Sequence, residues 1–71
     1  MTPAQWRLAS RLEETLRLEG ALTDASLCAM LGADLRDLRA AAGMLYRTRR
    51  ADRCGEYLVA VPRQREGRPA A

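Results

Sequence analysis

The 71-residue chain contains no histidine and no lysine, and it has only two cysteines. Histidine is the commonest general base and metal ligand, and lysine is an alternative base, so the usual partners that activate a serine or threonine are missing. A zinc site is also disfavoured because the closely spaced cysteine pair of specific zinc motifs is absent. We therefore expect no enzyme, no catalytic residues, no metal and no cofactor.

The two cysteines are Cys28 and Cys54, too few for a disulfide scaffold. Cys28 falls within a helical apolar pattern, which favours a buried thiol over a disulfide between the two. The chain also lacks an apolar run of about eighteen residues and a basic-then-apolar leader. These features predict a cytoplasmic protein that does not associate with a membrane.

The chain is shorter than the roughly 100–200 residues of an ordinary domain, so it has room for one hydrophobic core. Its composition, 48% hydrophobic and 30% charged, is typical of a folded domain. We expect that domain to span residues 1–62. Residues 63–71 show no apolar periodicity and predict a flexible basic C-terminal tail.

A first helix is predicted to begin after Thr2, because Pro3 suits a first helical turn and Gln5 completes a capping box with the threonine. It runs to about Leu18, and Gly20 is expected to end it in a left-handed conformation. Its buried stripe, with a spacing of four and Ala9 alongside, is Leu8, Leu12 and Leu16.

Two further helices follow a very short extended piece at residues 21–22. The pair Thr23-Asp24 caps a helix over 25–31 that ends at Gly32, and Asp34 caps a third helix over 35–47. The predicted buried stripe of the third helix, with Ala41 beside it, is Leu35, Leu38, Ala42 and Leu45.

The last part of the domain predicts a β-hairpin. The run Tyr57–Val61 is β-prone and closed by Pro62, and Gly55 provides the tight turn. The first strand is expected somewhere within Thr48–Arg53.

The segment 22–32, with Asp34 as the next cap and Leu38 as the first inward residue of the third helix, resembles the core of the winged helix-turn-helix superfamily. Gly32 stands at the turn between the two helices, and Cys28 stands where the family usually has a small alanine. The resemblance covers about residues 3–62. It implies a mainly α fold with a small β-hairpin (α+β), a three-helix winged helix-turn-helix.

The resemblance also implies double-stranded DNA as the partner, with the third helix in the major groove and the wing on the backbone or minor groove. Arg36 and Arg39 then become candidates for contacts to guanine O6 and N7. The remaining candidates would bind phosphates and are Arg47, Arg49, Arg50 and Arg53. The charge distribution agrees, because residues 1–37 carry a net charge of −2 and residues 38–71 carry +5.

We expect a transcription regulator or accessory factor of a bacterium or mobile element. A single winged helix covers only about 600–1,000 Å², so specific binding favours a homodimer that reads two half-sites. The candidate dimer surfaces are Trp6 with the outer side of the first helix, or the edge of the hairpin.

An alternative is a protein–protein interaction module, an adapter or inhibitor of a larger complex that does not itself bind DNA. The outward face of the third helix is predicted to carry Ala40, Gly43 and Met44, residues that suit a packed interface better than base reading. Trp6 lies on a flank of the first helix, where it covers the core edge or meets a partner. Acidic residues predicted to be exposed on that helix, which would suit a basic partner, are Glu13, Glu14 and Glu19.

Overall fold

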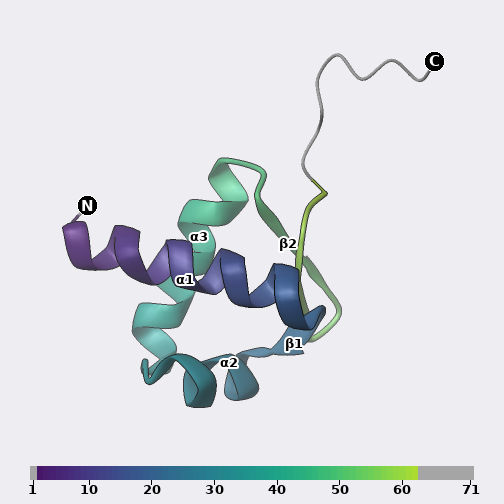
Figure 1. Cartoon of the computed structure of the whole chain (residues 1–71), viewed down its shortest axis with the longest axis horizontal. Helices are drawn as coiled ribbons and strands as arrows, with labels where there is room; N and C mark the ends of the chain where they lie inside the picture. The colour runs from purple at the N-terminus through teal and green to yellow at the C-terminus, as the bar shows by residue number, and fades with distance from the viewer. Residues whose placement is uncertain (1, 63–71) are drawn as a thin grey trace.

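Three helices pack beside a small three-stranded antiparallel sheet in the computed structural model, which describes residues 2–62 (Figure 1). The helices are α1 (Pro3–Glu19), α2 (Asp24–Leu31) and α3 (Leu35–Arg47). The strands are β1 (Leu22–Thr23), β2 (Ala51–Cys54) and β3 (Tyr57–Ala60). The predicted mainly α, α+β class is confirmed, whereas the predicted tail at 63–71 lies outside the described residues.

All three helices begin at the predicted caps. Thr2 and Gln5 form the reciprocal capping box, with N···O distances of 3.1 and 3.2 Å. Thr23 Oγ1 accepts from the amide of Ser26 at 3.2 Å, and Asp34 accepts from the amide of residue 37 at 2.9 Å. Each cap satisfies an amide that has no partner within its helix, so the chain's short polar residues fix where the helices start.

The first two helices end at glycines of different geometry. Gly32 lies in the left-handed region with φ 65° and ψ 34°, where a side chain would be strained, and this allows the sharp turn between α2 and α3. Gly20 also has a positive φ, 90°, but its ψ of −157° is extended rather than left-handed helical. The chain therefore leaves α1 directly into β1, unlike the left-handed end predicted for this helix.

Strand β3 is the centre of the sheet, and the strand order is β1-β3-β2. Leu22 of β1 pairs with Leu58 of β3, so the predicted extended piece joins the hairpin. On the other side, β2 runs antiparallel to β3 from Ala51↔Ala60 to Cys54↔Tyr57. Leu58 is fully buried, and the sheet thereby attaches the hairpin to the helical core.

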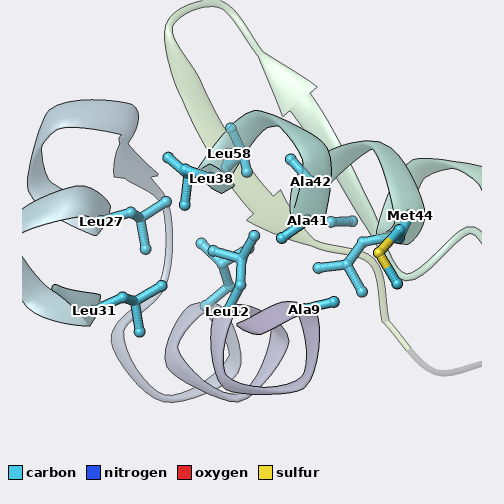
Figure 2. Packing of buried hydrophobic residues seen from close by; sticks show 12 residues of the cluster. Ala9, Leu12, Leu27, Leu31, Leu38, Ala41, Ala42, Met44 and Leu58 are labelled. Atoms are coloured by element: carbon cyan, nitrogen blue, oxygen red, sulfur yellow. The ribbon is translucent and has the colours of Figure 1, made fainter. Parts of the chain in front are cut away.

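The core lies where α1 crosses α3, with α2 and the sheet on its remaining sides. Figure 2 shows Ala9 and Leu12 of α1 directed toward α3, and Leu58 directed inward from the hairpin. The cluster has no aromatic member and consists of Ala9, Leu12, Leu16, Leu27, Leu31, Leu38, Ala41, Ala42, Met44, Leu45, Ala51 and Leu58. Two of the alanines, Ala9 of α1 and Ala41 of α3, lie between these helices, where small side chains let two helices approach closely.

The buried face of α3 differs from the predicted stripe at two positions. Leu35, expected inside, is 43% exposed because it lies in the first turn, at the edge of the covered face. Met44, expected on the outward face, is only 5% exposed and belongs to the core cluster. The prediction for both side chains is wrong, because α1 packs across α3 and covers the side that carries Met44.

Both cysteines are unpaired thiols. Cys28 is half-buried and packs against the core cluster, whereas Cys54 is exposed at the end of β2. The prediction of no disulfide is confirmed, although the Cys28 thiol is less buried than expected. None of the helices within residues 2–62 has the length and apolar content needed to cross a membrane.

Replacing Leu12 by alanine tests this core. The side chain is fully buried between helices, so Leu12→Ala should lower the free energy of unfolding by about 2–5 kcal/mol, measured by urea denaturation. The matched control is Leu18→Ala on the same helix, where the side chain is 77% exposed and the change should stay within about 0.5 kcal/mol. Equal effects of the two substitutions would contradict the packing.

Candidate nucleic-acid interface

The outward face of α3 carries cationic side chains beside small residues. Arg36, Arg39 and Arg47 are exposed, as predicted, and none of them has a carboxylate within ion-pair distance among residues 2–62. Ala40 is exposed and Gly43 is half-buried between these arginines. Three uncompensated positive charges therefore share one side of a helix with no long uncharged side chain between them.

A groove of about 380 Å³ runs between this face and the start of α1. It is lined by Gln5, Arg39, Ala40, Gly43, Met44 and Arg47. A Cβ on Gly43 would lie 3.9 Å from the nearest atom, an Arg47 side-chain nitrogen, so no neighbouring part of the chain requires glycine there. Glycine costs a helix interior about 1 kcal/mol relative to alanine, and within residues 2–62 nothing offsets that cost.

The residues predicted for a protein interface are only partly available. Met44 lines the bottom of the groove but is only 5% exposed and belongs to the core, so it offers little area to a partner. Trp6 is 45% exposed on the flank of α1, in agreement with its predicted position. Ala40 and Gly43 border the groove.

Arg50, predicted to bind phosphate, instead takes part in an ion-pair network centred on Glu13. One carboxylate oxygen of Glu13 accepts from Arg17 at 2.7 Å, and the other lies 3.5 Å from Arg50. Arg17 also donates to the carbonyl of Val61 at 3.1 Å. The network joins α1 to the open end of the hairpin, where the amide of Val61 donates to the carbonyl of Arg50 at 3.0 Å, and half of the Arg50 side chain remains exposed.

Glu13 itself was expected to be an exposed member of an acidic surface, and that prediction is wrong. The residue is 9% exposed because the two arginines cover it. Its neighbours Glu14 and Glu19 are exposed. The Arg17 partner was not predicted either, although its i+4 spacing from Glu13 was a signal in the sequence, whereas Arg50 reaches Glu13 only through the tertiary fold.

Arg53, the other predicted phosphate ligand on the hairpin, is paired with the start of α2. Its Nη2 donates to both carboxylate oxygens of Asp24, at 3.1 and 3.3 Å. The Asp24 carboxylate, and after it the nearby Tyr46 hydroxyl, favour the charged guanidinium and raise the pKa of Arg53. The pair is partly exposed, so it leaves the arginine accessible while offsetting its charge.

Arg49 occupies a strained position after α3. It is the single residue other than glycine with a positive φ within residues 2–62, at 59°. Its amide donates to the carbonyl of Tyr46 at 3.1 Å, and the amide of Arg50 donates to that of Leu45 at 2.8 Å. These two hydrogen bonds form a Schellman motif, in which the left-handed position is usually glycine.

Two features of this surface were missed by sequence reasoning. Asp24 and Tyr46 lie beside Arg53, although Asp24 was predicted only as part of a helix cap. The strain at Arg49 had a signal in the sequence, since no glycine follows the third helix before position 55. Within residues 2–62, no group of histidine, cysteine or acidic side chains is arranged to hold a metal ion.

Comparisons with protein families, with curated proteins and with solved structures found no significant match to this chain.

Substitution of Arg49 measures the cost of its backbone conformation. Arg49→Gly should raise the free energy of unfolding by about 1 kcal/mol, because glycine adopts a left-handed φ without a Cβ clash. Arg49→Ala is the matched control and should bring much less gain, since alanine keeps the Cβ. Denaturant unfolding of both variants decides the matter, and equal stability of the two would show that Arg49 is not strained.

Proposed function

We propose that this chain is a small winged helix-turn-helix protein that binds double-stranded DNA and acts as a transcription regulator or accessory factor. The order of elements supports the fold assignment: α2 and α3 are joined by a tight turn at Gly32, and the hairpin of β2 and β3 follows α3. In that arrangement α3 enters the major groove and the hairpin contacts the backbone.

One observation carries the proposal. The arginines of the outward surface, from α3 to its C-terminal turn, have no ion-pair partner among residues 2–62, whereas three arginines facing other elements are paired. On this surface the unpaired arginines are Arg36, Arg39, Arg47 and Arg49. Elsewhere within residues 2–62, Arg7 and Arg11 of α1 also lack an ion pair. An arginine surface without intramolecular carboxylates is suited to phosphates and base edges.

The cost of Arg49 and Gly43 supports the same conclusion. Each residue disfavours the folded chain by about 1 kcal/mol relative to a better-suited residue at its position. Backbone strain and suboptimal helix residues are concentrated at functional sites when an external partner needs them. Arg49 projects a cation from the turn after α3, and Gly43 leaves room for a backbone to approach between Arg39 and Arg47.

The predicted DNA ligands comprise arginines without an ion pair and arginines that are paired with a carboxylate. Arg36 and Arg39 stay candidates for base edges, and Arg47 and Arg49 for phosphates. Arg50 first has to give up part of its attraction to Glu13, so it is expected to add less to binding than an unpaired arginine. A homodimer that doubles this small surface remains part of the proposal.

Binding of labelled duplex, followed by fluorescence anisotropy at several salt concentrations, tests the proposal. If each of the four unpaired arginines of this surface neutralises one phosphate charge, the log–log slope is about −3.6. Arg47→Ala should weaken binding to all sequences and reduce the slope by about 0.9, whereas Arg36→Ala should reduce discrimination between sequences.

Arg11→Ala is the control for that experiment, because Arg11 is an exposed arginine of α1 without an ion pair among residues 2–62. It removes the same charge from a different helix and should change the slope little. No duplex binding at about 50 mM salt, where electrostatic attraction is strong, would contradict DNA binding and favour the protein-interaction module.

A further inference from the structure

A second hollow lies on the other side of Arg39, between α3, the start of α2 and strand β2. This α2–β2 cleft has a volume of about 320 Å³ and is lined by Asp24, Arg39, Ala42, Tyr46 and Arg53. Arg39 therefore borders both this cleft and the groove beside Gly43. The cleft gathers polar groups from three elements that are distant in the sequence.

The guanidinium of Arg53 is presented to the α2–β2 cleft by its contact with Asp24. Both hydrogen bonds to the carboxylate come from the same nitrogen, Nη2. No hydrogen bond from its Nε or Nη1 is found within residues 2–62. These two groups hold three of the five N–H donors of an arginine, so Arg53 can bind an anion without leaving Asp24.

The charges of the cleft define the ligand class. Arg39 and Arg53 contribute two positive charges and Asp24 one negative charge, which leaves a net charge of +1. A singly charged anion neutralises the cleft, whereas a dianion would leave a negative charge beside the Asp24 carboxylate. Among the groups on a nucleic acid, the backbone phosphodiester is such a monoanion, and arginine forks suit its oxygens.

We infer that the α2–β2 cleft binds one phosphodiester group, held by Arg39 and Arg53 with the Tyr46 hydroxyl as a further donor. The inference rests on the proposed function for the source of that group, the backbone of double-stranded DNA. It also assigns Arg39 to a phosphate instead of a base edge, which leaves Arg36 as the main candidate for sequence reading.

Asp24 has two opposing effects in this site. It positions Arg53, and its charge weakens the attraction between Arg53 and the phosphate. Asp24→Asn removes the charge but keeps an oxygen that accepts from Arg53, and asparagine is accepted at a helix start. We expect duplex binding to tighten by about twofold to fivefold, the range of a partly exposed ion pair.

Asp52→Asn is the matched control, because Asp52 is exposed on the same strand and its carboxylate accepts from the backbone amide of Arg53, at 2.8 Å. It removes the same charge without touching the guanidinium. The gain from Asp24→Asn should exceed that from Asp52→Asn and should disappear when Arg53→Ala is added. Equal effects of the two asparagine variants would overturn the role of Asp24.

The decisive experiment follows the side-chain Nε–H signals of Arg39 and Arg53 by NMR, in the full chain, during titration with a short duplex and with dimethyl phosphate. Dimethyl phosphate carries the same monoanionic diester as a nucleic-acid backbone. Both ligands should shift the two signals, and the shifts with dimethyl phosphate should weaken in Tyr46→Phe.

The two ligands separate the outcomes. Duplex binding that leaves both signals unmoved overturns the phosphodiester site and leaves the proposed function standing. Shifts with dimethyl phosphate, without any binding of duplex, support the site and overturn the proposed function. Absence of response to both ligands overturns both.

Discussion

The close packing of α1 across α3 is the constraint on which the rest of the molecule depends. Ala9 of α1 and Ala41 of α3 are small side chains where the two helices cross, and the surrounding leucines fill the space on either side (Figure 2). This contact decides which side of α3 is covered. It places Met44 inside and leaves the arginine-bearing side outward, so the packing of a core without aromatic residues positions the proposed interface.

The ion pairs determine which arginines of this surface keep an uncompensated charge. Arginines that fasten elements together are matched with carboxylates: Arg50 with Glu13, and Arg53 with Asp24. Arginines on the outward side of α3 have no such match among residues 2–62. The net charge of +3 therefore understates the local positive charge near α3, where few acidic side chains offset the arginines. Arg49 adds a further cation to this surface, and its left-handed backbone conformation lowers the stability of the fold.

The helix starts and the hairpin were predictable because they depend on local chemistry. Thr2, Thr23 and Asp34 cap the amides that follow them, whatever the tertiary packing. The errors lie where another element decides. Met44 and Leu35 exchanged environments because the covered face of α3 depends on where α1 crosses. Glu13 is buried by Arg17 of the same helix together with Arg50, which is 37 positions away. The cleft beside Arg53 also depends on tertiary placement, so no spacing in the sequence indicated it.

The central claim is that packing against α1 leaves one side of α3 to bind duplex DNA. Mapping of backbone amide chemical shifts on addition of duplex tests it most directly, because every position of the chain reports at once. The account predicts the largest changes at Arg36, Ala40, Gly43 and Arg47, and little change at Glu14 and Glu19 of α1. Changes concentrated around Trp6 and the exposed side of α1, or no changes at all, would contradict it.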